Sequence, residues 1–274
     1  MPFICTIASG SSGNSAVVSD GRTHILVDAG VSCRRIFQGL KELDIAPEDL
    51  SGVLITHEHN DHVRGLELLC VKTGVPVFTA SATASLIERQ MPRLYNSIKV
   101  IGAGEPFEIG DIGISAFDTP HDTPQSLGFS MTVDGYRLAY MTDIGCVTGE
   151  MLDAVRGAEY ICVESNHDLM MLLGGGYPEY LKRRIMSKRG HLSNTDCGDF
   201  ISQAVEWGAH EFLLCHLSRE NNQPRIAYDE AVAAVKAAGA TTGDGIGVHV
   251  APPGGLSHIC RFGESESLQL VMQF

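Results

Sequence analysis

One short stretch, residues 56–62, carries most of the side chains that could do chemistry. It reads T-H-E-H-N-D-H and holds three histidines and two acids. The apolar run before it, Gly52–Ile55, is typical of a buried strand. After it, from Val63 to Thr73, apolar residues recur at helical spacing. The sequence therefore predicts that the cluster lies on a strand-to-helix loop, where rigid elements can position its side chains.

The spacing within this loop indicates two metal-binding groups. In an extended segment, residues two apart point the same way, so His57 and His59 can bind one cation together. Asp61 and His62 lie beyond the bend and can reach a second cation. Imidazole and carboxylate donors suit Zn²⁺, Mn²⁺ or Fe²⁺. The alternative is a solvated polar loop in which Asn60 or Asp61 caps the next helix, but five donors in one loop favour the metal site.

Other potential ligands are scattered along the chain, yet each stands at or just beyond a predicted strand end, or at a helix start. They are Asp28, His121, Asp143, His191 and His216. If the strands pack side by side, these tips meet the histidine loop at one rim, with enough donors for two cations bridged by a carboxylate. Two cations about 3.5–4 Å apart can clamp an attacking water and a leaving oxygen. Asp28 could instead hold a ligating histidine, or cap the turn that follows it.

Two segments offer groups that could bind a phosphate. The turn Ser9–Asn14, S-G-S-S-G-N, presents hydroxyls and backbone N–H groups. The segment Gly190–Asn194, G-H-L-S-N, leads into a predicted helix. The candidate side chains are Ser11, Ser12, Asn14, Ser193 and Asn194. The first segment is also what an ordinary tight turn looks like.

Composition limits the class of protein. We expect residues 1–274 to form a single domain. The formal charge of −13 argues against a broad non-specific nucleic-acid surface. Five basic residues lie between Lys182 and Arg189, and this run is either a solvated helix face or a region that steers substrate.

Eight cysteines without a C-x-x-C pair indicate reduced, mostly buried thiols in a cytoplasmic protein. The N-terminus does not resemble a signal peptide, no apolar run is long enough to span a bilayer, and the oligomeric state is not indicated.

The remaining patterns predict the framework. Strands are expected at 3–8, 16–19, 24–29, 75–80, 127–133, 136–142, 160–164, 211–215 and 248–251, with short antiparallel strands between 98 and 118. Helices are expected at 32–43, 82–90, 148–156, 178–187, 195–207 and 227–238. Strands followed by mixed strands and helices, twice over, predict an α+β fold, a four-layer αββα sandwich. Met170 and Met171 are expected to make ordinary apolar contacts, and His167 either reaches the site or caps a loop.

The complete pattern resembles the metallo-β-lactamase superfamily, an αββα sandwich of binuclear metal hydrolases. The H-x-H-x-D-H loop carries this resemblance, together with the strand Asp before it and the His, Asp and His after it. The resemblance implies that His57, His59 and His121 bind the first metal, that Asp61, His62 and His216 bind the second, that Asp143 bridges them, and that Asp28 steadies the histidine loop.

Within the superfamily, five segments are similar to the YycJ/WalJ group, which lies near ribonuclease Z and the PhnP-type phosphodiesterases. They read S-G-S-S-G-N-S, E-S-N-H-D, Y-P-E-Y-L-K-R-R-I, G-H-L-S-N and H-L-S-R-E-N-N. This similarity implies a phosphodiesterase or nuclease, with 5′-to-3′ exonuclease activity on DNA, that uses a metal-bridging hydroxide. Asp61 would accept a proton, and Glu164 would pair with His191, which would protonate the leaving oxygen. No long insertion separates Asp143 from His191, so the capping domain of the β-CASP nucleases is not expected. The tRNA-clamping arm of ribonuclease Z is not evident, which argues against tRNA maturation.

Two other functions stay open. A hydrolase of the same fold could act on a cyclic phosphodiester, a lactone or a thioester, although the basic approach to Gly190–Asn194 favours a phosphate. A metal-bound sensor without turnover is the other possibility, and the complete set of ligand residues argues against it.

Overall fold

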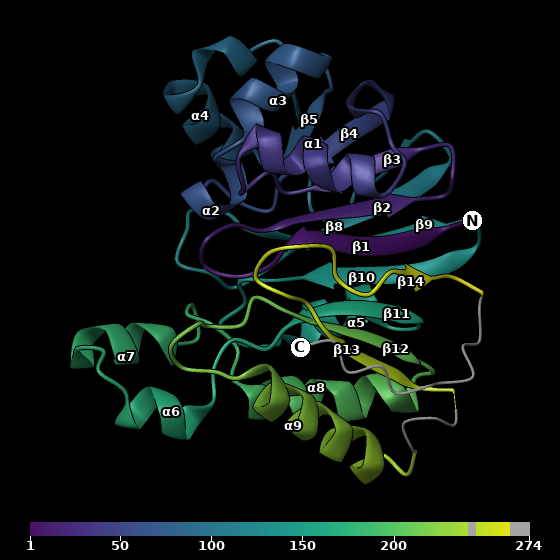
Figure 1. Cartoon of the computed structure of the whole chain (residues 1–274). Coiled ribbons are helices and arrows are strands. Elements are labelled where there is room, and N and C mark those ends of the chain that lie inside the picture. The colour runs from purple at the N-terminus through teal and green to yellow at the C-terminus, as the bar shows by residue number, and fades with distance from the viewer. Residues whose placement is uncertain (241–244, 264–274) are drawn as a thin grey trace.

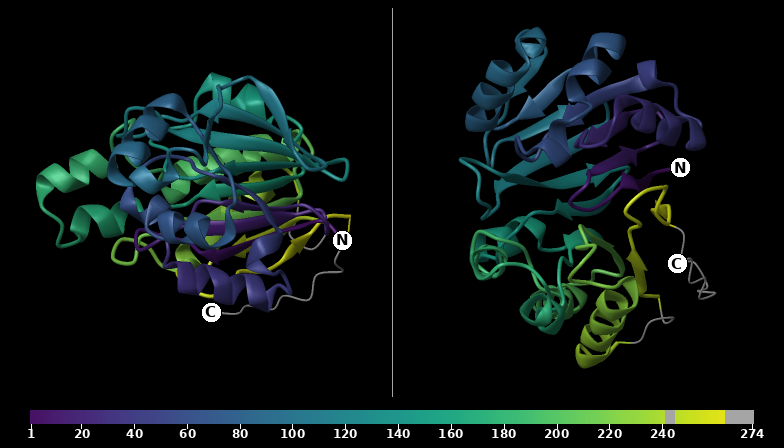
Figure 2. Two further views of the ribbon diagram at one scale, coloured as in Figure 1. Left: turned by 90° about the horizontal axis from the view of Figure 1, so that it is seen from above. Right: turned by 60° about the vertical axis from the view of Figure 1, so that its left-hand side comes forward.

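Two β-sheets packed face to face, with helices on both outer sides, make up the protein (Figures 1 and 2). The computed structural model describes residues 1–240 and 245–263. The layers run helix, sheet, sheet, helix, as the αββα prediction requires. None of the described helices is long and apolar enough to cross a bilayer.

In the described part of the chain, the first sheet has seven strands and begins antiparallel. In spatial order they are β14 (Cys260–Arg261), β1 (Phe3–Ala8), β2 (Ser15–Ser19), β3 (His24–Val27), β4 (Leu50–Leu54), β5 (Val77–Thr79) and β6 (Ile98–Val100). Strands β3 to β6 are parallel. Parallel strands need crossover connections, and here these contain helices, which cover the outer face of the sheet.

The second sheet mirrors this arrangement. Its strands, in spatial order, are β13 (Gly247–Val250), β12 (Glu211–Cys215), β11 (Tyr160–Glu164), β10 (Tyr136–Met141), β9 (Leu127–Val133), β8 (Ile112–Asp118) and β7 (Pro106–Ile109). Strands β10 to β13 are parallel, and β7 to β10 are antiparallel. The parallel strands β10, β11 and β12 therefore present their carboxyl ends at one edge.

The helices divide between the two faces. Helices α1 (Cys33–Glu42), α2 (Asn60–Val63), α3 (Leu66–Thr73) and α4 (Ser81–Gln90) belong to the first half, with short 3₁₀ turns at Pro47–Asp49 and Pro92–Leu94. Helices α5 (Gly149–Val155), α8 (Asn194–Glu206) and α9 (Pro224–Ala237) cover the second sheet. Helices α6 (Leu169–Gly174) and α7 (Glu179–Ile185) stand away from the body (Figure 1).

Three apolar cores hold these layers. Phe129 and Tyr140 lie in the core between the sheets. Leu40 packs in the core under α1 and α3, and Phe200 packs in the core under α8 and α9. All four side chains are almost fully buried, and burial of such a side chain contributes about 1.5–3 kcal/mol. The cores fix the sheets relative to each other, and so fix where the strand tips meet.

The structure corrects several local expectations. The helix expected from Val63 to Thr73 is split into α2 and α3, because the N–H of Gly65 bonds Ala29 O instead of a helical carbonyl. Strand β6 pairs parallel with β5, since α4 forms a crossover between them, and is not antiparallel as expected. Strand β14 follows the strand that was expected to be the last. Met170 is 75% exposed and makes no ordinary core contact.

Candidate metal centre

Three strand tips carry residues in a strained backbone conformation. Asp28, Asp143 and His216 stand just beyond β3, β10 and β12, with φ of 60°, 56° and 55°. Only two other non-glycine residues in the described part of the chain, Asp44 and Asp134, have positive φ. Such a conformation costs about 1–3 kcal/mol and persists where the surroundings impose it. The backbone turns sharply at each tip and directs the side chain along the rim.

The first group of donors is formed by three histidine rings. His57 Nε2 lies 3.0 Å from His59 Nδ1, and the ring centres of His57 and His121 are 4.9 Å apart. One nitrogen from each of His57, His59 and His121 lies within 4.8 Å of the others. The rings are oriented from outside, because His121 Nδ1 donates to Gly190 O at 3.2 Å and His57 Nδ1 donates to the Thr56 hydroxyl at 3.0 Å. Their Nε2 atoms are thereby left as potential ligands.

The second group of donors lies beside the first. His62 Nε2 is 3.1 Å from Asp143 Oδ2 and 3.6 Å from Asp61 Oδ2, while His216 Nε2 is 3.9 Å from Asp61 Oδ2. The other carboxylate oxygen of Asp143 lies 3.9 Å from His121 Nε2, in the first group. Asp143 therefore stands between the two groups of donors.

Two buried acids hold the histidines from behind. Asp28 accepts hydrogen bonds from His62 Nδ1 at 2.8 Å and from the Thr56 N–H at 2.9 Å. Glu164 Oε1 accepts from His191 Nδ1 at 2.8 Å and also from His216 Nδ1 at 2.7 Å. The bond between Glu164 and His191 agrees with the sequence analysis, but the bond to His216 was missed. An acid behind a ligating histidine fixes its tautomer and turns Nε2 toward the cation.

Glu164, His191 and His216 stabilise one another's charged forms. Burial alone would raise the pKa of Glu164, but His191 and His216 lower it to about 2. Burial would lower the pKa of His216, but Asp143 and Glu164 raise it to about 9. Burial would also lower the pKa of His191, which Glu164 raises above its usual value. This part of the rim attracts positive charge.

The pKa values of the other rim histidines shift in opposite directions. Burial holds the pKa of His57 well below its usual value and lowers that of His121. Burial acts in the same direction on His62, but Asp28 and Asp143 raise its pKa well above the usual value. His57 and His121 are thus neutral at pH 7, which is the form of imidazole that binds metals.

These residues fit divalent cations. Among the described residues, neither His216 Nε2 nor Asp143 Oδ2 has a hydrogen-bond partner, although both atoms are buried and face potential ligands of the rim. Buried polar atoms are normally satisfied, so such a pair needs an explanation. A site of imidazole nitrogens and carboxylate oxygens matches the preferences of Zn²⁺, Mn²⁺ or Fe²⁺. Cations between the two groups would satisfy both atoms.

The candidate phosphate-binding residues lie in different environments. Asn14 is buried against the rim, where its amide nitrogen lies 3.1 Å from His62 Nε2. Ser12 is near the surface, where its hydroxyl accepts from Arg219 at 2.9 Å, and Ser11 is exposed. Two further candidates make structural bonds: the Ser193 hydroxyl caps α8, accepting from the N–H of Asp196 and donating to its carboxylate, and Asn194 lies in a buried amide network with Ser165 and Asn222.

The basic run contributes a clamp that sequence reasoning missed. Arg189 donates to the carbonyls of His121 and Thr123, both at 2.6 Å, and Arg184 pairs with Asp122. Asp122 Oδ1 is in turn 3.3 Å from His121 Nε2. Part of this run is therefore not free to steer substrate, because Arg184 and Arg189, although exposed, fix the loop that carries His121. The D-T-P-H-D motif could have indicated this contact, because its second acid, Asp122, is the partner of Arg184.

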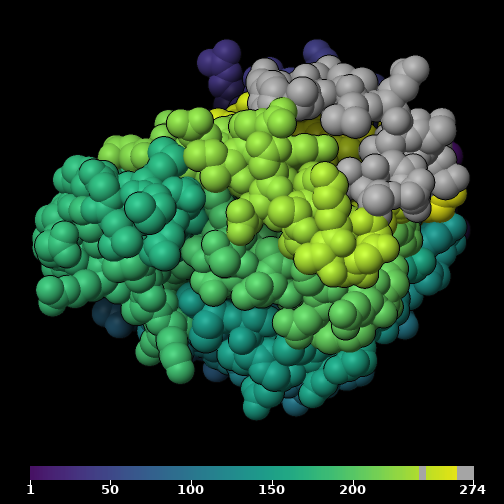
Figure 3. Space-filling model, turned by 90° about the horizontal axis from the view of Figure 1, so that it is seen from below, coloured from purple at the N-terminus to yellow at the C-terminus, as the bar shows by residue number. Residues whose placement is uncertain are grey.

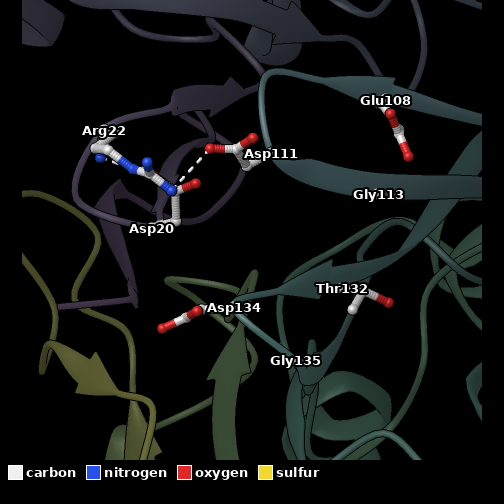
Figure 4. Close-up of a pocket in the computed structure, with 8 residues that line it drawn as sticks. All are labelled: Asp20, Arg22, Glu108, Asp111, Gly113, Thr132, Asp134 and Gly135. Carbon is white, nitrogen blue, oxygen red and sulfur yellow. Dashed lines mark hydrogen bonds and ion pairs between the residues drawn. The ribbon is translucent and has the colours of Figure 1, made fainter.

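A polar hollow lies at the opposite end of the strands. It has a volume of about 620 Å³ and is bordered by the β2–β3, β7–β8 and β9–β10 turns (Figure 4). Arg22 and Asp111 form an ion pair at 2.8 Å beside it (Figure 4). Asp134 borders it and precedes β10, whereas Asp143 follows β10 at the rim. The hollow is therefore separate from the metal centre.

The two facing sheets and the rim of histidines and aspartates define a protein of the metallo-β-lactamase fold. Residues 23–217 match the model of the beta-lactamase superfamily domain, so the chain belongs to that superfamily.

Two relatives extend over most of the chain. Exodeoxyribonuclease YycJ of Bacillus anthracis is 32% identical over 248 residues, covering 90% of this chain and 94% of its own. Exodeoxyribonuclease WalJ of Streptococcus pneumoniae is 35% identical over 225 residues, covering 81% of this chain and 84% of its own. The resemblance to the YycJ/WalJ group is therefore confirmed.

Solved structures agree with this fold. The metallo-β-lactamase fold protein YhfI from Bacillus subtilis superposes with a TM-score of 0.68 at 18% identity, over 93% of this chain and 99% of its own. A diphosphatase of the PhnP family gives 0.63 at 15% identity, over 93% and 97%. The short form of human tRNase Z gives 0.59 at 18% identity, over 79% and 93%. At these identities the similarity concerns the fold alone.

Proposed function

We propose that this protein is a metal-dependent phosphodiesterase that removes nucleotides from DNA, working in the 5′-to-3′ direction. The observation that carries the proposal is the meeting of seven histidine and aspartate side chains, from tips far apart in sequence, at one rim. The two relatives named exodeoxyribonucleases, each covering more than four fifths of this chain, support DNA as the substrate.

Two divalent cations, zinc or manganese with iron as a third choice, would occupy the two groups of donors. His57, His59 and His121 would hold the first, and Asp61, His62 and His216 the second, with Asp143 shared between them. Bound there, the cations would supply an activated water and neutralise charge on the phosphoryl oxygens.

The protein's own acids and bases would move the protons. Asp61, whose carboxylate faces His62 and His216, would accept a proton from the attacking water. His191 would protonate the leaving oxygen. Its Nδ1 is engaged by Glu164, and its side chain keeps 21% exposure, so the other edge of the ring can meet a substrate. Glu164 therefore acts by positioning both His191 and His216.

The phosphate of the substrate would rest on groups beside the rim. The turn at Ser11 and Ser12 presents hydroxyls next to the guanidinium of Arg219, a charge that suits a terminal phosphate. Asn14, Ser193 and Asn194 would contribute through the backbone segments that they support. Hydroxyls and N–H groups next to a helix start are a common setting for anions.

A substrate panel tests this proposal. Protein loaded with zinc or manganese is offered bis-(p-nitrophenyl) phosphate, 5′-phosphorylated DNA, lactones and thioesters. We expect hydrolysis of the phosphodiester and release of nucleotides from the 5′ end of DNA. Hydrolysis of a lactone or thioester without any phosphodiester would make the protein a small-molecule hydrolase instead. No hydrolysis of any ester with both cations bound would indicate a sensor.

The variant His191→Ala separates the proposed acid from the ligands. Loss of a general acid lowers turnover by about 10²–10⁴-fold. We expect this loss with an unchanged metal content, measured by mass spectrometry of the bound metals. His210→Ala, at a histidine outside the rim, serves as the control and should retain both properties. Loss of a cation from His191→Ala would assign His191 as a ligand.

A further inference from the structure

Residues 169–189, here called the α6–α7 arm, project from the body of the protein (Figures 1 and 3). Both ends of the arm are fixed beside the metal centre. At its start, the Asp168 N–H donates to Asn221 O at 2.9 Å, one residue after the buried His167. At its end, Arg189 grips the carbonyl of His121. The arm therefore begins and ends within a few residues of the rim.

The arm exposes apolar side chains to an unusual degree. Among the described residues, half of the exposed large apolar side chains lie on it, and these are Leu169, Met170, Leu173, Tyr180 and Met186. Met170 and Tyr180 are 75% and 76% exposed. Apolar groups gathered on a projecting element mark an interaction surface. The ordinary packing expected for Met170 does not account for them.

The charge of the arm indicates what kind of partner it binds. It carries five basic residues and one acid, Glu179, in a chain whose formal charge is −13. Lys182 is buried with its ammonium on Leu173 O, and Arg184 pairs with Asp122. Arg183 and Lys188 are exposed, and no described side chain forms an ion pair with either.

We propose that the α6–α7 arm is a binding surface for the single-stranded part of a DNA substrate whose end lies in the metal centre. Tyr180 and Met170 would contact bases, and Arg183 and Lys188 would contact phosphates. Single-strand binding surfaces combine exposed aromatic side chains, on which unpaired bases stack, with cations that follow the backbone. A duplex would hide its base faces from Tyr180. Contact between the arms of two copies would bring like charges together. This inference rests on the proposed function.

Binding and turnover are measured separately. The variants are Tyr180→Ala and the double variant R183A/K188A. The matched controls are Tyr95→Ala, a tyrosine that is 67% exposed elsewhere, and the double variant R93A/K41A. Fluorescence anisotropy gives the affinity of the metal-loaded protein for a single strand of about 16 nucleotides, the upper range for one binding module. The activity on this strand is divided by the activity on bis-(p-nitrophenyl) phosphate.

We expect Tyr180→Ala to weaken strand binding about tenfold and to lower the activity ratio by a similar factor. For R183A/K188A, the slope of log affinity against log salt should fall by roughly 0.7 for each lost phosphate contact. The controls should match the unchanged protein. Strand affinity and salt slope that stay unchanged in both arm variants would overturn the inference, even if the protein hydrolyses DNA.

Two further outcomes keep the inference separate from the proposed function. If the protein hydrolyses no phosphodiester but binds the strand with the expected losses in the arm variants, the arm is confirmed and the proposed function fails. If the protein is a dimer by sedimentation and Tyr180→Ala makes it a monomer without changing strand affinity, the arm is a contact between copies and the inference is wrong.

Discussion

Asp28→Asn should weaken the binding of one of the two proposed cations without removing any proposed ligand. The fully buried carboxylate uses Oδ1 to accept from the Thr56 N–H and Oδ2 to accept from His62 Nδ1. An asparagine that keeps its oxygen on the Thr56 N–H must turn its NH₂ group toward His62. His62 Nδ1 then has to accept, and its proton moves to Nε2, the atom that faces Asp61 and Asp143. A protonated nitrogen cannot bind a metal.

The size of the effect follows from the loss of this supporting bond. Removal of the partner behind a ligating histidine typically lowers metal affinity 10- to 100-fold, which is about 1.4–2.7 kcal/mol. The backbone is not a complication, because Asp28 has φ of 60° and asparagine tolerates this left-handed conformation as well as aspartate does.

Competition with a calibrated chelator measures the two affinities, and mass spectrometry measures metal content after dialysis. Asp134→Asn is a matched control, since Asp134 also has positive φ but lies exposed in the β9–β10 turn, away from the rim. We expect one affinity to fall in Asp28→Asn and neither to change in Asp134→Asn. Two cations bound at unchanged affinity in Asp28→Asn would refute the role of Asp28 in orienting His62.

Three further predictions concern the framework. Gly30→Ala drives a Cβ into the carbonyl oxygen of Asp61, so it should lower stability by about 1–3 kcal/mol or more and release a cation. Gly149→Ala, which meets open space, should do neither in thermal unfolding and metal analysis. Iodoacetamide at about pH 8 should modify Cys146 alone among the described cysteines, because the others are buried and burial raises the pKa of Cys70, for example, to about 12. Peptide mass spectrometry measures the labelling of each cysteine. Equal labelling of a buried thiol would contradict the prediction. Removal of the cations with a chelator should lower the melting temperature, because ligand at 100 times its Kd stabilises by about 2.7 kcal/mol; an unchanged melting temperature would mean that the rim binds no cation tightly.

Local patterns predicted most of the elements because they depend on neighbouring residues. Alternation and helical spacing placed β11, β12 and α8 within a residue or two of their observed bounds. The errors arose where a distant segment intervenes. The helix after the histidine loop breaks because Asp61 O accepts from the Asn14 N–H, and Gly65 bonds Ala29 instead. No pattern within residues 60–73 reveals this crossing.

The sequence by itself determined the kinds of donor and their place at strand ends, because the loop from His57 to His62 and the motif segments are short-range features. Only the tertiary structure decided which donors share a partner. Glu164 supports both His191 and His216, and the exposed Arg189 holds the loop that carries His121. Such choices depend on which strand tips meet when the sheets pack, and on which buried charges must then find a partner, so they exist only in the folded chain.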